Sequence, residues 1–155
     1  QDTKGDVFIV SVVVTSKERD ELLQICEDVE EKSGKGKFKW GKAEDKRRLE
    51  YLRSIFSLKI FKGKLRYSIY RHQVNYDMAT IVGIAKAIHF REPKNYTTLI
   101  YIDGLHKTKR HRYGSELRKL GVPTRKVQGI SKDENNTLVR LADAIAGFVL
   151  KSLCH

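Results

Sequence analysis

Residues 136–150, near the carboxyl end, constrain the fold of this chain more than any other stretch. Apolar side chains recur there at spacings of three and four residues, which predicts a helix with one buried face. An asparagine just before that stripe, at 135 or 136, can cap the helix by accepting a hydrogen bond from a backbone N–H. The rest of the chain must cover the apolar stripe, whose members are Leu138, Leu141, Ile145, Phe148 and Val149.

Asp143 lies in the middle of this predicted helix, and its neighbours are small. Burying an ionised carboxylate costs several kcal/mol unless the carboxylate is paired or bound to a cation. In one interpretation, Asp143 lies on the wet edge of the helix and pairs with Arg140 or Lys151. In the other, a second backbone or a ligand approaches Asp143 across the small residues Ala142, Ala144, Ala146 and Gly147.

The remaining sequence alternates between β-branched runs and helical stripes. Strands are predicted at Val7–Val14, Lys64–Arg71, Tyr96–Asp103 and Arg125–Ser131. Helices are predicted at Ser16–Lys32, Ala43–Leu58, Asn75–Phe90, Lys107–Leu120 and Asn136–Leu150. In the second helix, Leu49, Leu52, Ile55 and Phe56 are expected to face inward. This alternation predicts one α/β domain over residues 1–155, with the four strands in one largely parallel sheet and helices on its faces.

The positive charge of the chain is large and unevenly distributed. The net charge is +12, which favours a polyanionic partner, and nucleic acid is the commonest. Between residues 101 and 126, eight basic residues against two acidic ones carry +6 of that total. The phosphate-contacting candidates in this stretch are Lys107, Lys109, Arg110 and Arg112.

A second basic run, residues 35–42, interleaves lysines with aromatic residues. Lys39 and Lys42 could contact phosphates while Trp40 stacks on a base. The alternative is a basic surface beside a tryptophan that belongs to the core, and the sequence leaves the two open.

Several classes of protein are disfavoured. No apolar run reaches the ~20 residues that a membrane span needs, so no membrane partner is expected. Cys26 and Cys154 form neither a metal-type nor a redox-type pair, which favours a reducing, cytoplasmic setting. No glycine-rich phosphate loop with dinucleotide spacing is present, so no cofactor of that kind is expected.

Asp103 ends a predicted buried strand, and in open α/β sheets ligand sites lie at such carboxyl ends. With Asp143 it gives two carboxylates, the ligands that hard divalent cations prefer, and such cations keep several waters and so need few protein ligands. The sequence therefore suggests a Mg²⁺ or Mn²⁺ site at Asp103 and Asp143, where metal ions could assist phosphodiester cleavage.

Three segments resemble a known family, the domain of unknown function 3800 family of the ribonuclease H-like superfamily. They are residues 101–104 (Tyr-Ile-Asp-Gly), 127–132 (Val-Gln-Gly-Ile-Ser-Lys) and 141–147 (Leu-Ala-Asp-Ala-Ile-Ala-Gly), and the likeness extends over essentially the whole chain. The resemblance implies a mixed central sheet flanked by helices, an acidic metal site and nucleic-acid chemistry. It assigns Asp103 to the carboxylate of the fourth strand and Asp143 to that of the last helix.

The chain departs from the family pattern at two places. Family members open with a strand ending in Asp-Glu-Ser-Gly or similar, and this first strand is expected to be missing here, with residues 1–6 as the turn into the second strand. Lys37 stands where the family tends to carry a glutamate. Candidate substitutes for the missing ligands are Asp2, Asp6, Asp77, Asp133 and Glu134.

The leading hypothesis from the sequence is a divalent-metal-dependent nuclease in which Asp103 and Asp143 hold the metal and act in catalysis. The alternative is a nucleic-acid-binding or assembly protein of the same fold with an incomplete acidic site. A third hypothesis is a basic protein with an acidic protein partner, and a homo-oligomer stays open in each case.

Overall fold

The fold is described here from a computed structural model, over residues 2–4, 7–72, 75–90, 95–131 and 136–153. Its strands are β1 (Asp2–Lys4), β2 (Val7–Val13), β3 (Leu65–Arg71), β4 (Thr98–Asp103) and β5 (Thr124–Ile130). Its helices are α1 (Arg19–Ser33), α2 (Asp45–Ser57), α3 (Tyr76–Phe90), α4 (Arg110–Lys119) and α5 (Thr137–Leu153). Short 3-10 turns are η1 (Trp40–Lys42), η2 (Lys59–Phe61) and η3 (Lys107–Lys109).

The predicted strands and helices are all present, with ends that shift by a few residues. Asn136 caps α5, because its side chain accepts a hydrogen bond from the N–H of Val139 at 2.9 Å. The prediction of a turn at residues 1–6 is wrong for residues 2–4, which form β1 and pair with the start of β2.

The prediction of one largely parallel sheet is wrong. The described strands form an antiparallel sheet in the order β1-β2-β3 and a separate parallel pair, β4-β5. β1 pairs only with Val7–Ile9 of β2. Among the described strands, none pairs with both β2 and β4, so the two sheets stay separate. The apolar runs showed where strands lie, but strand direction depends on pairing, which alternation along the chain does not encode. The fold is therefore mixed α/β with two small sheets.

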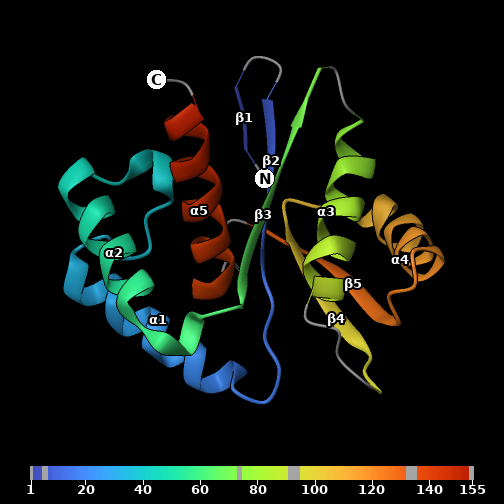
Figure 1. The fold of residues 1–155 in the computed structure, drawn as a ribbon, viewed down its shortest axis with the longest axis horizontal. Coiled ribbons are helices and arrows are strands. Elements are labelled where there is room, and N and C mark those ends of the chain that lie inside the picture. The colour runs from blue at the N-terminus through green and yellow to red at the C-terminus, as the bar shows by residue number, and fades with distance from the viewer. Residues whose placement is uncertain (1, 5–6, 73–74, 91–94, 132–135, 154–155) are drawn as a thin grey trace.

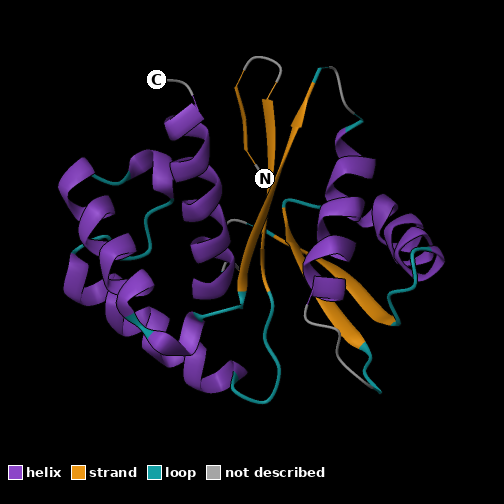
Figure 2. Ribbon diagram, in the orientation of Figure 1, coloured by secondary structure: helices purple, strands orange, loops and turns teal. Residues whose placement is uncertain are grey.

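Two groups of helices enclose the strands, as Figure 2 shows. Alternate side chains of β2 point to opposite faces. Val7, Ile9 and Val13 pack toward α1, α2 and α5, while Phe8 and Val10 pack toward α3 (Figure 1). A Cβ added to Gly83 would lie 2.6 Å from Val10 Cγ1, so this glycine lets α3 lie directly on β2.

Helix α3 also covers one face of the second sheet. Ile81, Ile84 and Ile88 share a buried cluster with Ile100 and Ile102 of β4. Because α3 contributes to the cores on both sheets, the two sheets are linked by side-chain packing around this helix.

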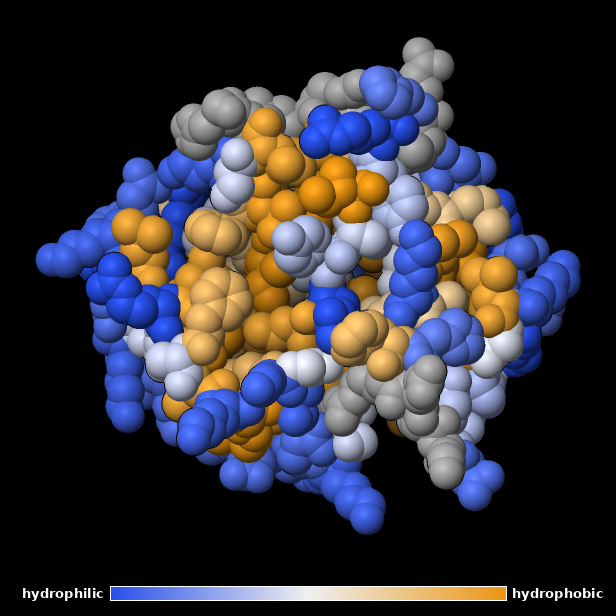
Figure 3. All heavy atoms as spheres, in the orientation of Figure 1, coloured by the Kyte–Doolittle hydropathy of each residue, from blue (hydrophilic) through white to orange (hydrophobic). Residues whose placement is uncertain are grey.

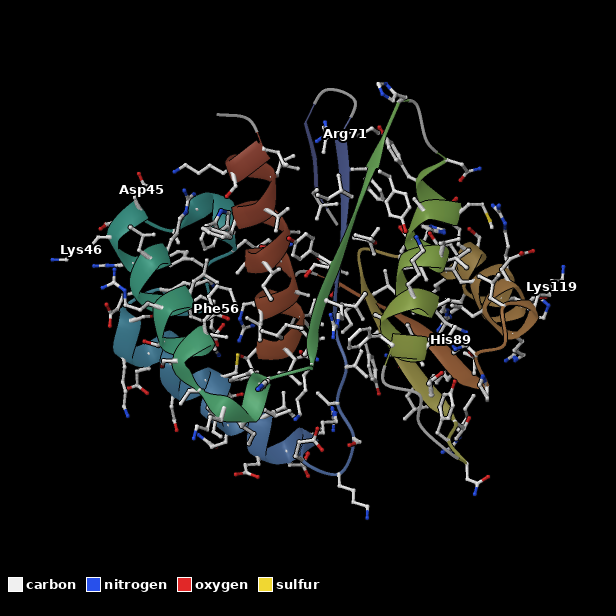
Figure 4. All side chains as sticks on the ribbon, in the orientation of Figure 1. Asp45, Lys46, Phe56, Arg71, His89 and Lys119 are labelled. Carbon is white, nitrogen blue, oxygen red and sulfur yellow. The ribbon has the colours of Figure 1, made fainter. Side chains whose placement is uncertain are left out.

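Two of the four side chains expected to face inward from α2 do not. Leu52 and Ile55 are buried, but Leu49 and Phe56 are each 56% exposed (Phe56 is labelled in Figure 4). The prediction for these two is wrong because α2 lies at the rim of the molecule, with only one narrow face against the core. Figure 3 shows apolar side chains gathered over α5 and the neighbouring strands, with hydrophilic residues around the outline.

None of the described helices is long and apolar enough to cross a membrane.

Candidate functional site

Asp103 is the last residue of β4, on the outward face of that strand. Along β4, outward side chains alternate with the buried side chains of Ile100 and Ile102. Asp103 therefore shares the outward face with Leu99 and Tyr101. The following turn is fixed by Gly104, whose φ of 74° favours glycine and whose N–H donates to Ile130 O at 2.9 Å. The sequence prediction of a carboxylate at this strand end is confirmed.

Gly129 of β5 explains how the loop after Asp103 returns over the sheet. A Cβ placed on Gly129 would lie 2.0 Å from the carbonyl oxygen of Leu105. Only glycine lets the backbone pass this close, so this residue of the Val-Gln-Gly-Ile segment helps set the position of the loop that follows Asp103.

Asp143 lies on α5 and accepts a hydrogen bond from the backbone N–H of Trp40, at 3.1 Å. The Trp40 ring covers Gly147, where an added Cβ would lie 2.2 Å from its Cδ1 atom. The small residues around Asp143 thus admit a second backbone, as one sequence interpretation held. The alternative partners lie elsewhere: Arg140 binds Glu30, and Lys151 Nζ lies 3.7 Å from Asp45.

Lys39 and its neighbour Trp40 each contact one of the two carboxylates. Lys39 Nζ donates to Asp103 Oδ2 at 2.8 Å, and both side chains of this ion pair are 32% exposed. The next residue, Trp40, donates its N–H to Asp143. Asp103 and Asp143, 40 residues apart in the sequence, therefore contact two successive residues of one segment, although they come from different parts of the fold.

The segment that carries Lys39 and Trp40 is held at both ends. The fully buried Lys35 Nζ donates to Phe38 O at 2.6 Å. Arg48 of α2 donates from Nε to Trp40 O at 2.7 Å, and its guanidinium lies 5.1 Å from the centroid of the Trp40 ring. Lys39 is thus presented to Asp103 by a backbone that is fixed on either side.

Glu30 and Arg140 form a buried ionic cluster with Lys35, the first residue of this segment. Arg140 donates to both carboxylate oxygens of Glu30, at 2.6 and 3.0 Å, and Lys35 Nζ lies 3.9 Å from Glu30. Burial lowers the pKa of Lys35, against the attraction of Glu30, which raises it. The hydrogen bonds to Glu30 raise the pKa of Arg140. The cluster ties α1, α5 and residues 35–42 together.

Sequence reasoning did not identify this cluster. A usable pattern was present, because Glu30 continues the spacing of four residues set by Leu22 and Cys26 on the buried face of α1. A charged residue at such a position predicts a buried partner. No pattern in the sequence indicated that this partner was Arg140, 110 residues away.

The predicted phosphate contacts after Asp103 lie in η3 and the first turn of α4. Lys107 is exposed and Arg110 half-buried. Lys109 and Arg112 are about half exposed and share a partner in α3, with distances of 3.1 and 3.7 Å to Asp77 Oδ2. The structure therefore places all four basic residues together, with part of their charge offset by Asp77.

In the other basic run, Trp40 and Lys42 differ in position. Trp40 is 7% exposed and belongs to the core, where it meets Phe148 edge-on, so its ring is not available to stack on a base. The stacking role predicted for Trp40 is wrong, and the alternative of a core tryptophan is confirmed. Lys42 is exposed, and Phe38 is the aromatic residue of this run on the surface, at 57%.

The outward face of β4–β5 has exposed apolar and basic side chains. Leu99 is 51% and Tyr101 41% exposed, and the register places Lys126 beside Leu99 and Gln128 beside Tyr101. Asp103 lies at the end of the same row. An aromatic ring with a lysine diagonally across on the neighbouring strand, on an open sheet face, suits base stacking with phosphate contact.

The described residues fit a divalent metal poorly. They contain no group of three or more His, Cys, Asp or Glu side chains able to hold an ion. The Lys39 ammonium lies where a cation would contact Asp103. Of the candidate substitutes, Asp77 binds Tyr113 and Lys109. Only the backbone of Asp2 is described, and Asp6, Asp133 and Glu134 lie outside the described residues.

Comparison with known proteins does not assign the chain to a family: no protein-family model matches it, and no curated protein is significantly similar.

Proposed function

We propose that this chain is a nucleic-acid-binding protein of ribonuclease H-like fold, whose binding surface runs from the outward face of β4–β5 to the basic turn at residues 107–112. The observation that supports this most is the placement of Lys107 and Arg110 directly after the strand that exposes Tyr101. Phosphate contacts give affinity regardless of sequence, and an exposed aromatic ring adds base stacking.

The ribonuclease H-like part of this proposal rests on the sequence resemblance and on the mixed α/β architecture. In its support, the strand-end carboxylate contacts Lys39 and the carboxylate on the last helix contacts the next residue, Trp40. The two separate sheets do not by themselves distinguish this fold from other mixed α/β folds.

A metal-dependent nuclease is the second candidate function. It is favoured by the approach of Asp103 and Asp143 to one dipeptide at the edge of the proposed binding surface. In that case both carboxylates would hold Mg²⁺ or Mn²⁺, which would supply an activated water for phosphodiester hydrolysis. The Lys39–Asp103 ion pair makes nucleic-acid binding without cleavage the better supported of the two.

The test is fluorescence anisotropy with labelled single-stranded and double-stranded oligonucleotides at several salt concentrations. Log affinity should fall linearly with log salt, by ~0.9 per neutralised phosphate on duplex and ~0.7 on single strands. The double variant Lys107→Glu/Arg110→Glu should weaken binding to all sequences and reduce the slope by about 1 for each lost phosphate contact.

The matched control is Lys46→Glu/Arg53→Glu, which makes the same charge change on α2, at the far side of the molecule from α4 (Figures 1 and 4). It should lower affinity much less. Equal losses in the two double variants would show that only the net charge matters, and binding that is independent of salt would refute the proposal.

A further inference from the structure

We propose that Lys39 is an internal cation of the acidic site: its ammonium takes the place of a divalent ion at Asp103, so that metal binds at Asp103 and Asp143 only when this side chain is removed or displaced. The inference concerns cations alone. It therefore stands or falls separately from nucleic-acid binding.

The first support is the contact itself. Lys39 Nζ lies 2.8 Å from Asp103 Oδ2, which is the length of a strong charge-assisted hydrogen bond. An ammonium and a metal ion cannot both occupy the same side of one carboxylate oxygen. A divalent ion would have to displace Lys39 or bind with it nearby, where two positive charges repel each other.

The second support is that Asp143 is compensated by the same segment. Trp40 donates its N–H to Asp143 Oδ2 at 3.1 Å. The buried ammonium of Lys35 is close enough to interact with Asp143 electrostatically. Residues 35–40 thus supply positive charge or a donor to both carboxylates, which is the task a metal ion performs in an acidic site.

The third support is that Lys39 is presented by a fixed backbone rather than a loose loop. Trp40 is wedged against Gly147, and its carbonyl oxygen accepts from Arg48 Nε at 2.7 Å. The Lys35 side chain holds Phe38 O on the other side. A backbone held in this way keeps the Lys39 side chain within reach of Asp103, so its ammonium is always available to compete with ions from solution.

The experiment is calorimetric titration of Mn²⁺ and Mg²⁺ into the wild-type chain and three variants. Lys39→Met removes the charge and keeps the length of the side chain. Lys39→Arg keeps the charge. Lys42→Met makes the same charge change three residues away at an exposed position in the same run. Circular dichroism melting confirms that each variant is folded.

We expect Lys39→Met to bind Mn²⁺ on the order of tenfold more tightly than the wild type, since a full charge beside Asp103 is removed. Lys39→Arg and Lys42→Met should stay at the wild-type level. Adding Asp143→Asn or Asp103→Asn to Lys39→Met should abolish the gain, which assigns the metal to these carboxylates.

Wild-type binding as tight as that of Lys39→Met would overturn the proposal, because Lys39 would then not compete with the ion. A folded Lys39→Met without any gain would also overturn it. Oligonucleotide binding is measured on the same proteins, so a failure of the nucleic-acid proposal is seen separately. In that case no variant would bind oligonucleotides, and the Mn²⁺ result would be unchanged.

Discussion

The segment at residues 35–42 contributes a lysine to each of two ionic groups, and these groups differ in burial. The buried ionic cluster has Glu30 at 3%, Lys35 at 0% and Arg140 at 6% exposure. The Lys39–Asp103 ion pair has both side chains 32% exposed. The chemistry is alike in both, lysine or arginine against carboxylate, but one pair is sealed from water and the other can meet a ligand.

The difference shows that burial sets how much stability is lost when one partner of an ion pair is removed. In the buried cluster, removing Glu30 leaves charges that water cannot reach, so this carboxylate acts as an obligatory tie between α1, α5 and the segment. At the surface pair, water replaces a lost partner at little cost. The stable cluster thus fixes the backbone, while the exchangeable pair faces solvent.

The largest effect is expected from Glu30→Gln. Two buried cations, Lys35 and Arg140, would lose their carboxylate, and we expect a loss of ~3–5 kcal/mol in the free energy of unfolding by urea. Lys35→Met is the matched control: it leaves no uncompensated charge, because Glu30 keeps Arg140, and should cost much less. A Glu30→Gln variant within ~0.5 kcal/mol of the wild type would erase the contrast between the two groups.

Gly147→Ala tests the segment at residues 35–42, which links the two ionic groups, since the Trp40 ring of this segment lies against the glycine. The added methyl group would overlap the Trp40 ring, and we expect a loss of ~2–3 kcal/mol in unfolding free energy, as for other overpacked cores. Trp40 is the single tryptophan, so its fluorescence should change as well. An unaltered spectrum with unaltered stability would mean that the segment is not seated here.

Asp77, at 23% exposure, lies between the two groups in burial. The hydrogen bond from Tyr113, followed by those of Lys109, holds the pKa of Asp77 below its ordinary value of 3.8. Asp77→Asn should cost ~1–2 kcal/mol at neutral pH. Because the folded-state pKa is depressed, this contribution is present above pH 3.8 and is lost as pH falls through the folded pKa.

The two proteins should therefore converge in stability on acidification, which urea unfolding at a series of pH values measures. A gap between them that persists unchanged at low pH would show that the Asp77 carboxylate is not the source of the difference.

The smallest effect is expected from Lys39→Met, at well under ~1 kcal/mol in the free energy of unfolding, because both partners of the ion pair reach solvent. High salt should reduce even this difference. A loss comparable to that of Glu30→Gln would place Lys39 in the structural core rather than at an exchangeable site.

Local patterns in the sequence predicted the helices and strands and both carboxylates. The stripe of α5, its asparagine cap and the small residues around Asp143 follow from spacing and side-chain size, which act over a few residues. Asp103 followed from the end of an apolar run. Leu49 and Phe56 were predicted wrongly because a helical stripe shows which residues share a face, but not how wide the neighbouring core is.

The sequence by itself thus determined the elements, the basic charge and the two acidic positions. Only the tertiary structure decided that the strands divide into two sheets, that Trp40 is core, that Asp103 pairs with Lys39, and that Asp143 accepts from the Trp40 N–H rather than from Arg140 or Lys151. The physical reason is range. Side-chain period and capping act between near neighbours, whereas the pairs Lys39–Asp103 and Glu30–Arg140 join residues 64 and 110 positions apart, which meet only when the helices have packed.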